Sequence, residues 1–152
     1  MAGVAQGKAR RYRGAMNPDV TREAACACGQ LKATLEGEPL MVSSCCCTRC
    51  QRRTGTFFGV TVYYRPAQMV ARSGEASAFH RPDGSTTFHF CPMCGSSLWW
   101  VPDDVAEDVI GVAGGCFADP TLPAPQRMVW TEHRHPYVRP PEGVRTYPGD
   151  AD

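Results

Sequence analysis

Long apolar runs are missing from this 152-residue sequence. No stretch approaches the roughly 18 consecutive apolar residues that a membrane-spanning helix requires. The first twenty residues, MAGVAQGKARRYRGAMNPDV, also lack the apolar centre of a secretory signal peptide. We therefore expect a protein of the reducing cytoplasm, with no membrane partner.

An excess of one charge sign is missing as well. Sixteen Lys and Arg residues face 15 Asp and Glu residues, and the formal net charge is +1. Because the central part of the chain carries no concentrated basic stripe, we expect no nucleic-acid partner.

Helical periodicity is scarce too, whereas 15 glycines and 13 prolines make a composition rich in turns. Such a composition favours many short strands over long helices.

Cysteine, by contrast, is abundant and grouped. Eight of the nine cysteines fall into the segments Cys26-Ala-Cys28-Gly, Cys45-Cys-Cys-Thr-Arg-Cys50 and Cys91-Pro-Met-Cys94-Gly. Buried structural cysteines need no such spacing, whereas sulfurs two or three residues apart converge easily on one metal ion. An odd count and a cytoplasmic context argue against disulfides. The cysteine pattern therefore predicts metal sites.

The pattern of apolar residues predicts one mostly β domain with little helix, stapled by zinc. At this length one domain is expected, which we place at residues 21–138, between a flexible N-terminal tail at 1–20 and a C-terminal tail at 139–152. The hairpin signal Asp83-Gly84 precedes one of the predicted strands, and Gly55 ends the single predicted helix, at 48–54. The predicted strands lie at 30–35, 57–64, 86–90, 97–101, 109–113 and 126–131.

The first and last cysteine groups together predict a closed site. Cys26 and Cys28 point the same way if that segment is extended, and Cys91 and Cys94 form a knuckle. The glycine that follows each pair supplies a left-handed backbone conformation. Four thiolates complete a tetrahedral zinc ion, which is typical of a structural site.

The middle group predicts a different site. Cys45, Cys47 and Cys50 can converge on one ion, whereas Cys46 points the other way in an extended segment. Three ligands leave one position open, as in catalytic zinc sites, unless Cys116 or a histidine closes it. A zinc ion on three thiolates is a poor generator of hydroxide and is better suited to holding a soft substrate thiol as the thiolate.

Three arginines crowd this middle group. Arg49, Arg52 and Arg53 could lower thiol pKa values and bind the carboxylates of a substrate. The alternative is a solvated helix face without a ligand. We treat them as weak substrate-binding candidates.

The order C-x-C-G, C-x-C-x-x-C-Q with a following T-G, and F-C-x-x-C-G resembles the glutathione-dependent formaldehyde-activating enzyme (GFA) family, which also includes the centromere-protein-V proteins. The likeness runs from about Cys26 to Pro120. It implies a mostly β fold of several small antiparallel sheets and two zinc ions per chain. It places a structural zinc on Cys26, Cys28, Cys91 and Cys94 and a substrate-facing, catalytic zinc on Cys45, Cys47 and Cys50.

The resemblance also implies an activity, namely carbon–sulfur lyase chemistry that joins glutathione and formaldehyde into S-hydroxymethylglutathione. One departure is Cys46, where members often have histidine. Two functions therefore stand: a zinc-dependent carbon–sulfur lyase acting on a glutathione or related thiol adduct, and a non-catalytic zinc-stapled protein-binding module. Nothing in the sequence indicates the oligomeric state.

Overall fold

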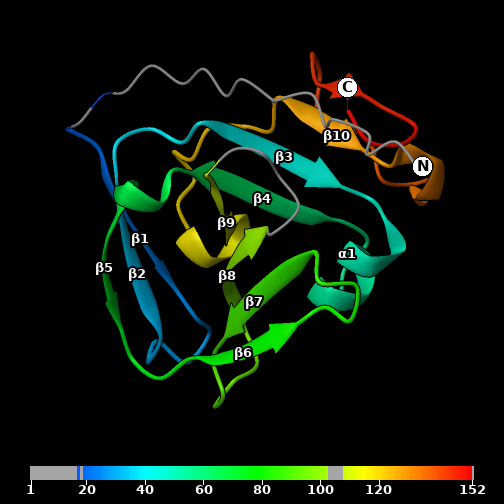
Figure 1. Cartoon of the computed structure of the whole chain (residues 1–152). Helices are drawn as coiled ribbons and strands as arrows, with labels where there is room; N and C mark the ends of the chain where they lie inside the picture. Colours follow the sequence, from blue (N-terminus) through cyan, green and yellow to red (C-terminus); the bar gives the residue numbers. More distant parts are fainter. Residues whose placement is uncertain (1–16, 18, 103–107, 152) are drawn as a thin grey trace, which may run out of the picture.

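The computed structural model describes residues 17, 19–102 and 108–151, which form two β-sheets and one α-helix (Figure 1). The smaller sheet is antiparallel and has the strand order β1-β2-β5. Its strands are β1 (Thr21–Ala25), β2 (Lys32–Glu36) and β5 (Met69–Ser73). Most of the predicted N-terminal tail lies outside the described residues.

The larger sheet has eight strands in the order β11-β10-β3-β4-β9-β8-β7-β6. Its strands are β3 (Met41–Cys45), β4 (Gly59–Tyr64), β6 (Ser77–His80), β7 (Thr86–Phe90), β8 (Ser97–Pro102), β9 (Ile110–Ala113), β10 (Arg127–Val129) and β11 (Arg145–Thr146). Neighbours are antiparallel, except that β10 runs parallel to both β3 and β11. The mostly β prediction is confirmed, but the antiparallel sheets expected from the family are here one small sheet and one large mixed sheet.

The single α-helix, α1 (Thr48–Thr54), begins and ends where the sequence predicts. Gly55 ends it in the left-handed conformation, with φ 67°, and donates its N–H to Gln51 O. Three short 3₁₀ helices complete the structure: η1 (Pro66–Gln68), η2 (Gly114–Phe117) and η3 (Thr131–His133). No helix in the described part of the chain is long and apolar enough to cross a membrane.

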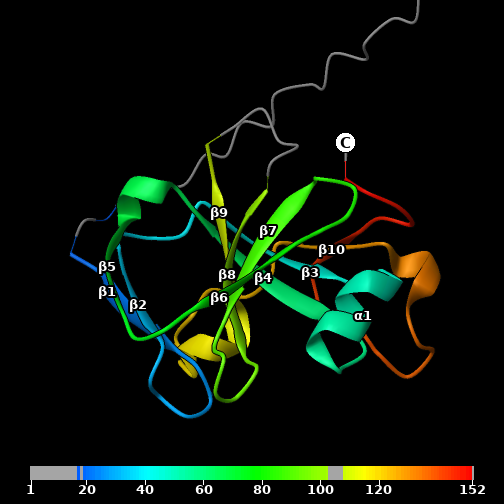
Figure 2. The ribbon, with the colours of Figure 1, turned by 60° about the horizontal axis from the view of Figure 1, so that its bottom comes forward.

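The main core lies between the small sheet and the central strands of the large one (Figure 2). Leu31, just before β2, and Leu35 in β2 pack with Val62 and Val112 of the large sheet, and all four are at most 1% exposed. The alternation of apolar and polar residues in the predicted strand at 30–35 therefore indicates correctly which face is buried. A second, smaller cluster contains Cys46, Met128 and Val138.

The segment after residue 139, predicted as a tail, runs along β10. Besides the pairing of β11, Tyr147 N donates to Met128 O at 2.9 Å and Trp130 N donates to Gly149 O at 2.8 Å. Val144 packs against the smaller cluster. These contacts hold the described C-terminal residues against the edge of the large sheet.

Candidate metal centres

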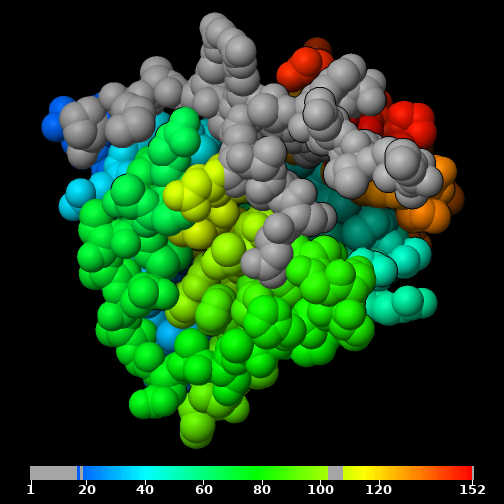
Figure 3. Space-filling view, in the orientation of Figure 1, coloured from blue at the N-terminus to red at the C-terminus, as the bar shows by residue number. Residues whose placement is uncertain are grey.

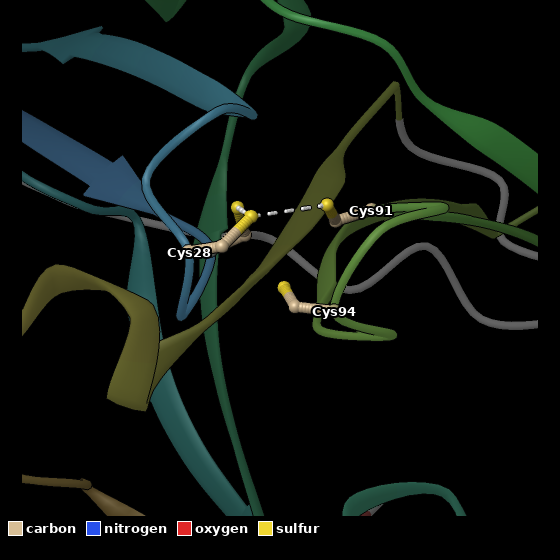
Figure 4. Close-up of side chains that lie close together, drawn as sticks. Cys28, Cys91 and Cys94 are labelled. Atoms are coloured by element: carbon tan, nitrogen blue, oxygen red, sulfur yellow. Dashed lines mark hydrogen bonds between the residues drawn. The ribbon is translucent and has the colours of Figure 1, made fainter.

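Two turns bring the first four cysteines together. Cys26 and Cys28 lie in the turn between β1 and β2, and Cys91 and Cys94 in the turn between β7 and β8 (Figure 4). We call these residues the four-sulfur group, whose sulfur atoms all lie within 4.8 Å of one another. The Sγ of Cys28 is 3.5 Å from that of Cys26 and 3.7 Å from that of Cys91. Four thiolates at 2.3 Å from one tetrahedral zinc ion would lie about 3.8 Å apart, so this group fits such an ion.

Both turns of the four-sulfur group have the same shape. Gly29 N donates to Cys26 O and Gly95 N donates to Cys91 O, each at 2.9 Å. The two glycines have φ 78° and 77°, as the sequence predicts. The extended conformation expected for Cys26 and Cys28 is wrong, because Cys26 N donates back to Leu31 O and closes a tight turn. A metal ion held here would tie one sheet to the other.

Neighbouring donors stabilise the thiolates of this group. Gln30 Nε2 donates to Cys91 Sγ at 2.9 Å, and Leu31 N donates to Cys26 Sγ at 3.3 Å. The Gln30 amide is itself fixed by two hydrogen bonds to the backbone of Glu75. Hydrogen bonds from the hydroxyl and backbone of Ser96 lower the pKa of Cys94 to about 5. Sequence reasoning missed Gln30, since a single glutamine carries no spacing signal.

The middle cysteines form a second group, the three-sulfur group, at the junction of β3 and α1. Cys45 is the last residue of β3, Cys47 caps the helix N-terminus, and Cys50 lies in the first turn. Their three sulfur atoms lie within 4.8 Å of one another. Cys50 N donates to Cys47 Sγ at 3.3 Å, so the same sulfur both caps the helix and faces its two neighbours.

Electrostatics favour a cation at this junction. Hydrogen bonds from the thiols of Cys45 and Cys50 lower the pKa of Cys47 to about 2. The hydrogen bond to Cys47 raises the pKa of Cys45. Ionisation of Cys47 is therefore favoured over that of Cys45. A bound metal ion would let all three ionise, and soft thiolates suit such an ion.

The three-sulfur group has no fourth side-chain ligand among the described residues. Cys46 is fully buried and packs with Met128, away from the group, as its position in the sequence predicts. Cys116 donates its S–H to Ser97 O at 3.6 Å and packs against the main core. No described histidine joins either group of sulfurs. Within the described part of the chain, one side of this site is therefore open.

The open side faces a pocket of about 250 Å³, which we call the sulfur pocket. Two tryptophans, Trp100 and Trp130, line it together with the three sulfurs. Trp100 and its neighbour Trp99 lie on opposite faces of β8, and Trp99 packs in the main core. The sulfurs therefore lie at the base of a recess with aromatic walls.

Three arginines also line the sulfur pocket: Arg53, Arg81 and Arg127. The Arg53 guanidinium lies 4.4 Å from the ring centre of Trp100. Arg127 is only 8% exposed, and its Nε donates to Ser43 Oγ at 3.1 Å. Arg81 and Arg127 were not identified from the sequence, because each stands alone and far from the cysteines. The pocket thus combines thiolate ligands with fixed positive charge.

The other two predicted arginines lie elsewhere. Arg49 forms an exposed ion pair with Asp83 at 2.7 Å. Arg52 lines a neighbouring pocket rather than the sulfur pocket. Of the three, the structure brings Arg53 alone to the open side of the three-sulfur group.

Comparisons with known proteins give a family and a fold for this chain. The family model described as glutathione-dependent formaldehyde-activating enzyme matches residues 21–133. A crystal structure of a Rhodobacter sphaeroides protein superposes with a TM-score of 0.52 at 16% identity, covering 82% of this chain and 98% of that one. At this identity the likeness is one of fold. A search of curated proteins finds no match to this chain.

Proposed function

Because the chain belongs to the glutathione-dependent formaldehyde-activating enzyme family, we propose that it is a zinc-dependent carbon–sulfur lyase acting on a glutathione or related thiol adduct. The reaction would join glutathione and formaldehyde into S-hydroxymethylglutathione and reverse that step. The observation that carries the proposal is the three-sulfur group, which lines a pocket and has no fourth described ligand. This is the arrangement of a substrate-facing site rather than of a closed one.

Two zinc ions per chain have separate roles in this proposal. The four-sulfur group, whose Cys26 and Cys91 are at most 4% exposed, would hold the structural ion. The three-sulfur group would hold the other. Zinc bound there would supply the charge that keeps a substrate thiol ionised near neutral pH.

The pocket's own residues bind and orient the thiol substrate. Arg53, Arg81 and Arg127 present guanidinium groups to its carboxylates, and Trp100 holds the Arg53 guanidinium in place. Walls of Trp100 and Trp130 exclude water from the sulfur. The substrate sulfur then attacks the carbonyl carbon, the C=O π electrons move to oxygen, and that oxygen takes up a proton. The reverse reaction breaks the same carbon–sulfur bond.

Cobalt substitution with a glutathione titration tests the open site. Thiolate binding should change the visible spectrum of the cobalt protein, and it should do so at lower concentration with glutathione than with a small thiol that lacks carboxylates. The enzyme should also speed NMR exchange between formaldehyde and its glutathione adduct. The Cys50→Ser variant should lose both effects.

Two results would contradict the proposal. No spectral change with any thiol would mean a closed site and favour the non-catalytic protein-binding module. Thiol binding without faster exchange would keep the thiol pocket but remove formaldehyde as the substrate.

A further inference from the structure

A second and larger pocket adjoins the sulfur pocket. It has a volume of about 610 Å³ and lies between α1 and the β6–β7 hairpin. In the space-filling view the two segments, cyan and green, meet at the surface (Figure 3). Its apolar walls are the rings of Phe79, Phe88 and Phe90. We call it the arginine–phenylalanine pocket.

The two pockets share three lining side chains, those of Arg53, Arg81 and Phe88. A ligand whose reacting end lies at the sulfurs would pass these side chains to reach the larger space. The larger pocket holds none of the metal-binding cysteines. It is therefore placed to bind the part of a substrate that does not react.

The larger pocket is strongly positive. Four arginines line it, against one acid, Asp83, which is already paired with Arg49 at 2.7 Å. Arg52, Arg53 and Arg81 make no ion pair with any carboxylate in the described ranges. The Nε of Arg53 is also buried without a hydrogen-bond partner. A buried donor of this kind is costly unless a ligand satisfies it.

Aromatic rings hold two of these guanidinium groups in place. The Phe88 ring centre lies 5.2 Å from the Arg53 guanidinium and 5.1 Å from that of Arg81. Cation–π contacts fix their direction before a ligand arrives. The pocket therefore combines an apolar wall with preset positive charge.

We propose that this enzyme prefers, over formaldehyde, an aldehyde with an aromatic body and a carboxylate, which binds in the arginine–phenylalanine pocket. The proposal rests on the proposed thiol chemistry at the three-sulfur group. Formaldehyde is too small to use this space, and glutathione has carboxylates but no apolar side chain to contact three phenylalanines. An aromatic carboxylate matches both features, the rings and the guanidinium group of Arg52, which lines the larger pocket but not the sulfur pocket.

Such an aldehyde would react by the same steps as formaldehyde. The thiolate sulfur forms a bond to the aldehyde carbon, the C=O π electrons move to oxygen, and the proton that the thiol gave up ends on that oxygen. Nothing is oxidised or reduced, and the product is a hemithioacetal. The carboxylate takes no part in the reaction and serves only for binding.

Binding is tested without turnover, by ¹⁹F NMR on the zinc-loaded protein. The probe is 4-(trifluoromethyl)benzoate, and its matched neutral control is 4-(trifluoromethyl)benzamide. We expect the benzoate to bind roughly tenfold more tightly, as one charge-assisted contact would provide. Arg52→Gln and Phe79→Ala should each weaken benzoate binding about fivefold, whereas Arg139→Gln, an exposed arginine outside the pocket, should not. Benzoate binding no tighter than benzamide, or displacement of the benzoate by glutathione, would overturn the proposal.

Turnover separates this inference from the proposed function. Exchange with glutathione is compared for 4-formylbenzoate, benzaldehyde and formaldehyde. Fastest catalysed exchange with 4-formylbenzoate, and loss of that preference in Arg52→Gln, would support the inference. Equal or faster exchange with formaldehyde would overturn the inference and leave the proposed function standing. Tight benzoate binding with no exchange of any aldehyde would overturn the proposed function while supporting the ligand class of the pocket.

Discussion

Cys46 and Cys116 are the two cysteines that belong to neither sulfur group, and their surroundings keep both thiols protonated. Burial raises the pKa of Cys46, and burial raises the pKa of Cys116 to about 11. Cys116 nevertheless lines a pocket of about 480 Å³ and so can be reached by a small reagent. Cys116 can therefore be reached by a reagent even though its thiol is protonated.

Alkylation of Cys116 should depend steeply on pH. Since the thiolate is the reactive form, we expect its rate with iodoacetamide in the zinc-loaded protein to rise about tenfold per pH unit from 7 to 10. The alkylation rate of free glutathione should level off within that pH range, because an ordinary thiol is fully ionised near the upper end of the range. Site-resolved mass spectrometry measures both rates. A Cys116 rate that levels off with that of glutathione would contradict the raised pKa.

Some functional residues could be predicted from the sequence, and others could not. All seven predicted metal ligands lie in the two sulfur groups, because ligand spacing is local and readable. Arg127 reaches the sulfur pocket through the pairing of β10 with β3, which are distant in sequence, and Arg81 reaches it from the β6–β7 hairpin. An isolated arginine in a sequence carries no sign of what the fold will bring beside it.

At the scale of elements, α1 depends on the three-sulfur group. The helix has seven residues, none of them buried, and its N-cap is the sulfur of Cys47. So short a helix is not stable alone. We expect selective removal of the metal from this group, as in Cys45→Ser, to speed amide hydrogen exchange across residues 48–54. Exchange at β8 should stay slow and serves as the internal control. Unchanged protection of the helix would mean that the metal does not hold it.

At the same scale, Gly95 shapes the turn that holds Cys91 and Cys94. Gly95 has φ 77°, and a Cβ built on it would meet nothing within 4 Å, so Gly95→Ala should cost only the backbone strain. That strain is about 1–2 kcal/mol of unfolding free energy. Gly115→Ala is the matched control, with equal open space but no positive φ, and should not lower stability. Denaturant unfolding of the zinc-loaded proteins measures both, and equal losses would contradict a conformational role for Gly95.

Alternation between a buried and an exposed face made some of the strands predictable. β7 alternates around Phe88, and its bounds match the prediction. β3 was missed, because its central Val42, Ser43 and Ser44 are all buried and give no alternation. Ser43 is tolerated there because its hydroxyl accepts from Arg127 Nε. Parallel pairing of β10 with β3 was also missed, since no turn signal in the sequence marks a parallel pair.

At the scale of the whole molecule, the two metal groups should differ in what they stabilise. Cys91 is fully buried in the main core and its group bridges the two sheets, so Cys91→Ser should abolish cooperative unfolding or solubility. Cys47→Ser should leave a folded protein with about one tightly bound zinc instead of two. Thermal melts and elemental analysis of protein purified without chelator decide this. Equal collapse of both variants would contradict the separation of roles.

If both sulfur groups bind metal, the distance along the chain between their cysteines should set the order in which they bind it during synthesis. The three-sulfur group is complete within Cys45 to Cys50, so a nascent chain can present all its ligands as soon as that segment emerges. The four-sulfur group joins Cys28 to Cys91 across 63 positions and cannot exist until both hairpins have formed. The proposed substrate-facing ion would thus bind first, and the proposed ion between the sheets would bind last, once the fold is complete.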